Sequence, residues 1–549
     1  MRGKRRRDTD RPEFVELKSL RAYVKSAIRE YLESDTPFGL RKEEREKYRL
    51  QVQRLRHALR TCIYGEGGEK DYVKHYIMRE IVGLNLSVWE KTCLLPVNNP
   101  EKLTVEQQFR IILYRYMKQY GKDGFRKLCE KGGLPRETER EDGNYYEITE
   151  QDIRQIYTDE TIILSNQEIM DLICDMVYEG FGHGIIDRLR DCRLEGISGG
   201  VAGLPEQFFR YETIRNREYE EKYAHDSVFV MLNGITVRLS FLSFGSEQEL
   251  KRVIKSLLRF EAPGELSYYR PYMVNDMKDG SRVFACRPPF SETWAFFIRK
   301  FDSAEEKKPE ELVIGEGAED VIQALRYFVS GGLHIAITGA QGSGKTTLLK
   351  ALVRYISPKY NLRIAESVFE LWMRRVLPQR NILTFRETES VDSTEGLDAF
   401  RKTDGNCLMM GEVASIQAAA LMIELSQVSE QQLFTHHAVT TEKLLGYFKN
   451  ALLRTGVYSD EKMAREQVAE AFDIHVLCER DLNGKRYIKE IAEVNATEGG
   501  SIRRLYCYRD GKYVREGIPT KELLERMRVR IETKDKERIG RFFDGGVEL

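Results

Sequence analysis

The segment that decides the fold is a glycine-rich run, Gly339-Ala340-Gln341-Gly342-Ser343-Gly344-Lys345-Thr346. It fits the pattern G-x-x-x-x-G-K-[ST] of the phosphate-binding P-loop. The run before it, 333–338, is short, apolar and rich in β-branched residues, which predicts a buried strand. The run after it, 347–353, predicts the first turns of an amphipathic helix. A strand, a glycine loop and a helix in this order form the setting in which the pattern binds phosphate.

Each part of this loop has a physical role in binding an anion. The glycines let the backbone curl until several N–H groups converge, and the helix N-terminus adds the positive end of its dipole. Lys345 would neutralise the β- and γ-phosphates, and the Thr346 hydroxyl would ligate Mg²⁺. A flexible loop with a chance lysine is the alternative, which the flanking strand and helix disfavour. The residues expected to bind the nucleotide are Gly339, Ala340, Gln341, Gly342, Ser343, Gly344, Lys345, Thr346 and Thr347.

A second apolar run ends in a carboxylate. Residues 408–412 read Leu-Met-Met-Gly-Glu, which predicts a strand followed by Glu412. Ligands of open α/β sheets bind at the carboxyl ends of the strands, so we expect Glu412 beside the P-loop. There it could hold a Mg²⁺-bound water or polarise the attacking one. An ordinary acid at a strand end is the alternative.

Length and charge exclude some classes of protein. A chain of 549 residues is too long for one core. Lys plus Arg and Asp plus Glu number 87 each, so no overall field steers the chain towards nucleic acid or membrane. The basic run 2–7 could touch either one, or serve as a solubilising tail. No apolar stretch suits a transmembrane segment or a signal peptide, and nine scattered cysteines suit a reducing compartment, so we expect a cytoplasmic location.

The hydrophobic periodicity divides the chain into three expected domains. Residues 1–165 predict a helical extension, with a capping box at Thr104 and a polar linker candidate at 135–145. Residues 166–308 predict a small α+β domain, with a hairpin at Asn233-Gly234. In residues 309–549 strands and helices alternate, which predicts a parallel sheet covered on both faces.

Several motifs in one order carry a family resemblance. Besides the P-loop, they are 364–371 (Ile-Ala-Glu-Ser-Val-Phe-Glu-Leu), 410–413 (Met-Gly-Glu-Val), 435–438 (Thr-His-His-Ala), 182–187 (Gly-His-Gly-Ile-Ile-Asp), 279–283 (Asp-Gly-Ser-Arg-Val) and 298–301 (Ile-Arg-Lys-Phe). Over roughly 170–500 the chain resembles the type II/IV secretion ATPases, most closely the Tad/CpaF branch that drives pilus assembly. In that comparison 364–371 is the acidic box, 410–413 is Walker B, and 435–438 is the end of the histidine box. The implied fold is a RecA-like P-loop domain preceded by the α+β domain and the helical extension.

The resemblance assigns roles to single residues. Glu366 would be the acidic-box carboxylate near the metal and the attacking water, and Glu412 would orient that water and help Thr346 with the metal. His437 would sense the γ-phosphate. Arg282 and Arg299 would reach from the α+β domain onto the nucleotide, like arginine fingers. Taken from the residues alone, a solvated acid, a packing histidine and surface arginines remain the alternatives.

The resemblance also implies an activity and partners. ATP and Mg²⁺ would be the cofactors, and hydrolysis to ADP and phosphate would drive domain closure and the export or assembly of pilin-like subunits. The chain would form a homo-oligomer, a hexamer, and dock on an inner-membrane platform protein at the cytoplasmic face. No nucleic acid partner is implied.

The sequence departs from the family pattern near the phosphate site. Ser367 stands where a second acid is usual, and 404–406 replace R-P-D. Residues 413–415 lack the usual arginine, and 428–431 lack the G-H-x-G part of the histidine box. The loss of one polar ligand typically costs about 10²–10³ in rate, so these losses predict slow hydrolysis. Nucleotide binding should survive, because the P-loop is intact. The alternatives are an ATP-binding regulatory or assembly subunit and, ranked below it, a DNA-associated P-loop protein.

Overall fold

The computed structural model describes residues 13–34, 41–64, 67–140, 143–160, 162–202, 228–261, 264–301, 307–366, 369–388, 391, 395, 398, 402–495 and 500–543. The chain divides into two compact units, Met1–Ser303 and Ala304–Leu549. The basic run 2–7 and Ser367 of the acidic box lie outside the described residues.

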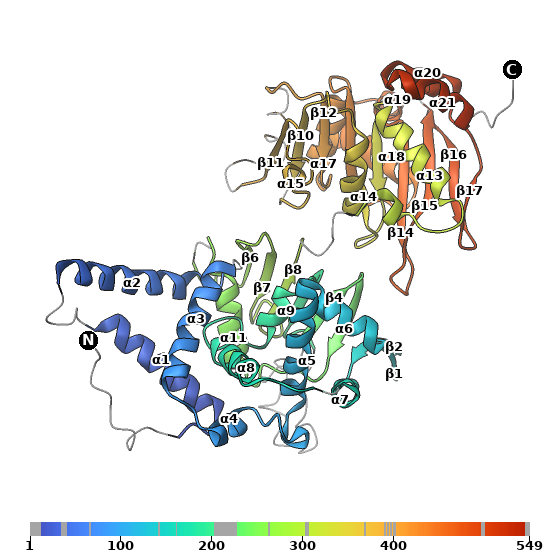
Figure 1. The fold of residues 1–549 in the computed structure, drawn as a ribbon. Coiled ribbons are helices and arrows are strands. Elements are labelled where there is room, and N and C mark those ends of the chain that lie inside the picture. The colour runs from blue at the N-terminus through green and yellow to red at the C-terminus, as the bar shows by residue number, and fades with distance from the viewer. Residues whose placement is uncertain are drawn as a thin grey trace. The chain divides into compact units, whose positions relative to one another are not determined.

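The first unit combines helices with one mixed sheet (Figure 1). Its helices are α1 (Leu17–Glu33), α2 (Lys42–Thr61), α3 (Gly67–Gly83), α4 (Val88–Leu94), α5 (Val105–Tyr120), α6 (Gly124–Gly132), α7 (Glu150–Asp159), α8 (Asn166–Tyr178), α9 (Asp187–Asp191) and α11 (Glu247–Leu257). Its strands are β1 (Arg136–Arg140), β2 (Gly143–Ile148), β3 (Gly196–Gly199), β4 (Val228–Leu232), β5 (Ile235–Leu239), β6 (Tyr272–Asp276), β7 (Arg282–Cys286) and β8 (Ala295–Arg299).

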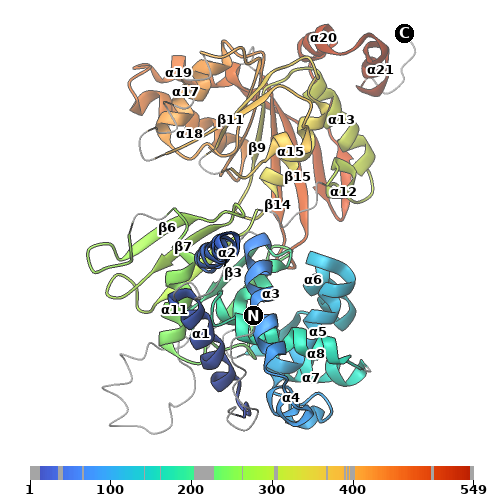
Figure 2. The same cartoon turned by 60° about the vertical axis from the view of Figure 1, so that its left-hand side comes forward.

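The sheet of this unit buries one face and exposes much of the other. Its strand order is β1-β2-β5-β4-β3-β8-β7-β6. Alternate residues of β6 and β8 are buried, as expected for strands with helices on one face only. The buried residues form one core together with α1, α5 and α8, so the helical first third and the α+β segment share a core. Figures 1 and 2 show α1, α2 and α3 grouped in the same part of the unit, where α3 contacts α1, α2 and α8.

Two sequence patterns located elements of this unit. The capping box at Thr104 is present, since its hydroxyl accepts from the N–H of Gln107 at the start of α5. The Asn233-Gly234 hairpin is confirmed, with β4 and β5 paired on either side and φ of 51° and 81° at the two turn residues. Asparagine and glycine tolerate positive φ, which explains why this pair makes the turn.

One part of the helical extension differs from the expectation. The polar stretch 135–145 is no linker, because it contains β1 and the first half of β2, which pair antiparallel with each other. β2 then pairs in parallel with β5, so the hairpin extends the sheet at its edge. β1 reads Arg-Glu-Thr-Glu-Arg and has no apolar alternation to reveal a strand. β1 forms through its backbone hydrogen bonds with β2. Its charged side chains suit an edge strand, because charges there hinder pairing with the edge of another molecule.

The second unit is the α/β domain. Its helices are α12 (Pro309–Leu312), α13 (Ala318–Ser330), α14 (Lys345–Leu352), α15 (Met373–Val376), α17 (Ile416–Ser426), α18 (Thr441–Arg454), α19 (Glu461–Ala471), α20 (Lys521–Arg530) and α21 (Thr533–Phe543). Its strands are β9 (Ile335–Thr338), β10 (Leu362–Glu366), β11 (Ile382–Arg386), β12 (Cys407–Met410), β13 (Gln431–His436), β14 (Ile474–Arg480), β15 (Arg486–Asn495), β16 (Ser501–Arg509) and β17 (Lys512–Arg515).

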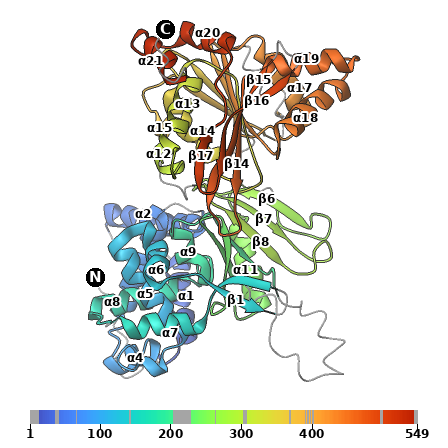
Figure 3. The same cartoon turned by 90° about the vertical axis from the view of Figure 1, so that its right-hand side faces the viewer.

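A central sheet with helices on both faces organises this unit (Figure 3). The strand order is β11-β10-β12-β13-β9-β14-β15-β16-β17, parallel from β11 to β14 and antiparallel from there on. Along β9, Ile335 and Ile337 join one core, with α13 and α14, and Ala336 joins the other, with α17, α18 and α19. The alternation has the period of two that a strand imposes. The predicted RecA-like α/β class is confirmed.

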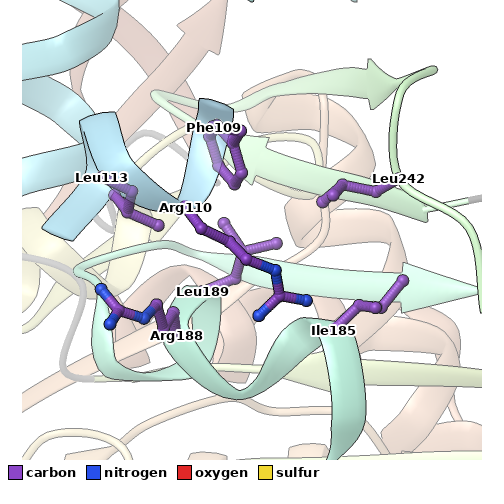
Figure 4. A pocket seen from close by; sticks show the side chains of 7 residues that line it. All are labelled: Phe109, Arg110, Leu113, Ile185, Arg188, Leu189 and Leu242. Atoms are coloured by element: carbon purple, nitrogen blue, oxygen red, sulfur yellow. The ribbon is translucent and has the colours of Figure 1, made fainter. Parts of the chain in front are cut away.

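The described part of the chain contains a small cavity of about 10 Å³ in the first unit, room for about one water. Its lining residues are Phe109, Arg110, Leu113, Ile185, Arg188, Leu189 and Leu242 (Figure 4). Arg110 pairs with Glu179, and Arg188 pairs with Asp175. None of the residues expected at the nucleotide site lines it. No helix in the described ranges is both long and apolar enough to cross a bilayer.

Candidate functional site

The P-loop begins where β9 leaves the sheet. β9 is fully buried between β13 and β14, and α14 starts at Lys345. The glycines have φ of 145° at Gly339, 75° at Gly342 and 92° at Gly344, a region that side chains strongly disfavour. At Gly339 a Cβ would also lie 2.1 Å from the carbonyl oxygen of Cys478. The loop conformation therefore requires glycine.

The loop contains a polar group that a phosphate would satisfy. Ser343 is 2 % exposed, and its Oγ has no hydrogen-bond partner among the described residues. An unsatisfied buried hydroxyl costs about 1–3 kcal/mol, so a ligand oxygen at this position would offset that cost. A triphosphate would suit this loop in three ways. It could accept from the Ser343 hydroxyl, bind the backbone that the glycines curl, and lie at the positive N-terminus of α14.

Magnesium would fit beside the loop. Thr346 lies in the first turn of α14 and is partly exposed, and the side chain of Glu412 is 41 % exposed. The described His, Cys, Asp and Glu side chains form no group of three or more that could hold a metal by themselves. A Mg²⁺ ion would therefore draw its ligands from Thr346, Glu412 and phosphate oxygens, as is usual for this ion in nucleotide sites.

Lys345, His437 and Glu412 meet at the carboxyl ends of the parallel strands. Nζ of Lys345 donates to the carbonyl oxygens of Gly339 and Ala340, both at 2.9 Å, and lies 3.3 Å from Nδ1 of His437. On the other side of the imidazole, Nε2 lies 3.1 Å from Oε1 of Glu412. An ammonium group can only donate, so Nδ1 accepts and Nε2 carries the proton that faces the carboxylate. The lysine and the glutamate predicted for this site are thus joined by one histidine.

The two consecutive histidines have different surroundings. His436 is buried in β13, its Nδ1 lies 2.8 Å from the carbonyl oxygen of Val413, and burial lowers its pKa. His437 follows the strand and is 44 % exposed. Packing therefore explains His436, whereas His437 lies at the site.

Glu366 is buried beside Walker B. It ends β10, is 5 % exposed, and its Oε1 accepts the N–H groups of Glu370 and Leu371 at 3.0 and 2.8 Å. Its Oε2 has no partner among the described residues, and burial raises the pKa of the carboxyl to about 7. A Cβ on Gly411 would lie 3.2 Å from Cγ of Glu366. The solvated acid considered as an alternative is therefore excluded.

Arg282 and Arg299 lie side by side in the first unit. They are direct partners across β7 and β8, so their side chains share one face of the sheet. Nε of Arg282 lies 3.3 Å from Oδ1 of Asp276, and the guanidinium of Arg299 lies 5.4 Å from the ring centre of Phe301. The structure brings these two together, while their reach onto the nucleotide stays a prediction.

Two of the N-terminal signatures are joined by a buried polar chain. In 182–187, the backbone N–H of His183 donates to Asp187 at 2.7 Å, and the histidine ring lies 3.1 Å from Nη1 of Arg190. Nη2 of Arg190 donates to Asp279 at 2.8 Å, and Asp279 accepts the N–H of Ser281 at 2.9 Å. This chain holds the turn that precedes β7.

The departures from the family pattern have local structural roles. Ser415, in the run that lacks the arginine, caps α17 by accepting the N–H of Ala418 at 3.1 Å. Asp404, in the run that replaces R-P-D, pairs with Arg363 of β10. Gln431 is fully buried at the start of β13. These residues support the sheet and its helices.

Two arginines that sequence reasoning missed lie at the P-loop. Arg480 ends β14 and Arg486 begins β15, and Nε of Arg486 donates to the carbonyl oxygen of Gly342 at 2.9 Å. A tight turn joins these two antiparallel strands. No local pattern could reveal that this hairpin lies against a loop about 140 residues earlier in the chain.

Parts of the chain are similar to known proteins. The family model described as "Type II/IV secretion system protein" matches residues 289–450, which include β9, the P-loop, β12 and β13. The conjugal transfer protein TrbB of Rhizobium radiobacter is 24% identical over 229 residues, which are 41% of this chain and 68% of TrbB.

Among solved structures, similarity is low. The VirB11 ATPase of the Brucella suis type IV secretion system is 19% identical, with 57% of this chain and 96% of that chain covered and a TM-score of 0.30. The Legionella pneumophila ATPase DotB is 13% identical, with 65% and 86% covered and a TM-score of 0.39. Residues 289–450, which carry the P-loop with β9, β12 and β13, are therefore similar to type II/IV secretion system proteins.

Proposed function

We propose that the protein is the ATP-hydrolysing motor of a type II/IV secretion or pilus-assembly system of the Tad/CpaF kind. The observation that carries the proposal is the meeting of Lys345, His437 and Glu412 beside a glycine loop built for phosphate. In the reaction, water attacks the γ-phosphorus in line, the bond to the β–γ bridging oxygen breaks, and ADP and phosphate leave.

In this proposal, residues of the second unit have separate roles in the reaction. Lys345 exchanges loop carbonyls for the β- and γ-phosphates, and Glu412 orients the attacking water. His437, which contacts both, senses whether the γ-phosphate is present. Glu366 is the nearby acidic-box carboxylate. When bound, Mg²⁺ neutralises phosphate charge, and Thr346 and Glu412 are the residues that would hold it.

Coupling to transport requires the other parts of the chain. Arg282 and Arg299 would add positive charge to the transition state when the α+β domain closes over ATP, a contribution worth about 10³–10⁵ in rate for an arginine finger. The chain would act as a homohexamer, peripheral at the cytoplasmic face of the inner membrane, on a platform protein. It would export or assemble pilin-like subunits. The family match and the motif order support this assignment.

A second candidate is an ATP-binding regulatory or assembly subunit of the same machinery. Ser415 favours it, because the position after Walker B caps a helix instead of supplying an arginine. Binding would then be tight and turnover slow. A DNA-associated P-loop protein ranks third, since only the basic run 2–7 motivates it. Retention on DNA that fails to weaken steeply with salt would argue against it.

Steady-state phosphate release from the full chain tests the motor. We expect Mg²⁺-dependent release that disappears in Lys345→Ala and falls strongly in Arg282→Ala and Arg299→Ala, while both arginine variants still bind ATP. Turnover of the wild type no higher than that of Lys345→Ala, with ATP bound tightly, would support the regulatory subunit instead.

A further inference from the structure

The β14–β15 hairpin places two guanidinium groups against the P-loop. Arg480 and Arg486 are direct partners in the antiparallel register, so both side chains lie on one face of the ladder. Arg486 donates from Nε to the carbonyl oxygen of Gly342 at 2.9 Å. A Cβ on Gly342 would lie 3.1 Å from Nη1 of Arg480, and one on Gly344 would lie 3.4 Å from Cδ of Arg486. Both arginines therefore touch the loop, and its glycines leave room for them.

Both members of this pair carry a positive charge, and they are direct partners in the ladder. Elsewhere on the hairpin opposite charges meet, since Lys489 of β15 lies 2.8 Å from Glu479 of β14. Where the ladder reaches the phosphate loop, two positive charges face each other. A bound polyphosphate would attract both guanidinium groups.

We propose that Arg480 and Arg486 are nucleotide-binding residues, an arginine pair that contacts the polyphosphate from the same unit as the P-loop. This inference rests on the proposed function, because it requires the P-loop to bind ATP. Guanidinium groups make charge-assisted hydrogen bonds to phosphate, often in pairs. The pair acts on affinity for ATP and ADP alike, in contrast to Arg282 and Arg299, whose expected effect is on turnover.

Equilibrium binding of a fluorescent ADP to the full chain tests the pair. Arg480→Ala and Arg486→Ala should each raise Kd by about tenfold or more, the effect of losing one hydrogen bond to a charged group. Arg486→Lys, which keeps the charge but not the planar fork, should fall between the wild type and Arg486→Ala. The matched control is Lys489→Ala, which removes a cation from the same strand and should leave Kd unchanged.

Two further measurements, the salt dependence of affinity and the melting temperature, distinguish direct contact of the arginines with phosphate from a structural role in holding the P-loop. The affinity of the wild type should fall more steeply with salt than that of the double alanine variant, because the variant has lost two charges. The melting temperature without nucleotide should match that of the wild type. A Kd change that comes with a lower melting temperature and an unaltered salt slope would overturn direct contact.

The outcomes also separate this inference from the proposed function. If the double variant binds ADP as tightly as the wild type while Lys345→Ala does not bind, the arginine pair has no role and the P-loop assignment stands. If the wild type binds neither ADP nor ATP, the proposed function fails and the inference falls with it.

Discussion

Nε2 of His437 lies 3.1 Å from Oε1 of Glu412. The other ring nitrogen lies 3.3 Å from Nζ of Lys345, so one imidazole connects the Walker A lysine to the Walker B glutamate. The connection is possible because β13, which ends at His436, lies between β9 and β12 in the sheet. A γ-phosphate that draws Lys345 away would change the hydrogen bonding of His437 and hence of Glu412.

Removing the imidazole should therefore slow hydrolysis more than it weakens binding. We expect His437→Ala to lower turnover by about 10², the usual cost of losing one preorganised polar contact to the reacting groups. The affinity for ADP should change little, because Lys345 can still bind the phosphates in this variant. Phosphate release and fluorescent-ADP binding measure the two effects.

His437→Gln is the matched control, since its amide can donate to Glu412 and should recover part of the rate. Full activity in His437→Ala would show that the imidazole only fills space.

Glu366 should make stability and activity depend on pH. Burial raises its pKa from 4.5 to about 7, so the folded protein holds this proton more tightly than the unfolded chain does. The stabilisation is fully present below pH 4.5 and is lost as the pH rises to about 7, a change of about 3 kcal/mol. Urea unfolding across this window should show the loss in the wild type.

Glu366→Gln keeps an oxygen for the N–H groups of Glu370 and Leu371 but cannot ionise. The stability of Glu366→Gln should lack this part of the pH dependence. The rate of phosphate release by this variant should also lack the change near neutral pH that the wild type shows. Identical pH profiles of stability in the two proteins would contradict the buried, titrating carboxyl.

Alanine substitution should have opposite effects at two glycines, one in the P-loop and one in α18. Gly339→Ala should abolish nucleotide binding, because its Cβ would lie 2.1 Å from a carbonyl oxygen and φ is 145°. Gly446, inside α18, has open space around a Cβ, so Gly446→Ala should stabilise the protein by about 0.5–1 kcal/mol through helix propensity. Thermal unfolding and ADP binding compare the two. Binding that survives Gly339→Ala would refute the steric account of the loop.

Loss of the N-cap of α17 should change the stability of the protein. Ser415→Ala removes the acceptor for the N–H of Ala418 and should destabilise the second unit by about 1 kcal/mol. Ser415→Asn keeps a capping oxygen and should cost much less. Chemical denaturation of the two variants measures the difference, and equal stabilities would mean that the cap contributes nothing.

Local patterns in the sequence predicted those features that depend on near neighbours in the chain. The P-loop and its strand and helix were found because glycines, apolar runs and a lysine lie within about 20 residues, the scale on which periodicity acts. Glu412 was found because its strand is apolar throughout. β1 was missed because a charged edge strand has no apolar pattern. The burial of Glu366 was missed because it depends on neighbours that are far away in the chain.

By itself, the sequence determined that a phosphate loop is present, where its strand and helix lie, and which motifs accompany it. Only the tertiary structure decided that His437 bridges Lys345 and Glu412, that Glu366 is buried against Gly411, and that Arg480 and Arg486 touch the loop. The physical reason is the strand order. Parallel strands bring together residues that are many tens of positions apart, and neither spacing nor periodicity along the chain encodes which strand lies beside which.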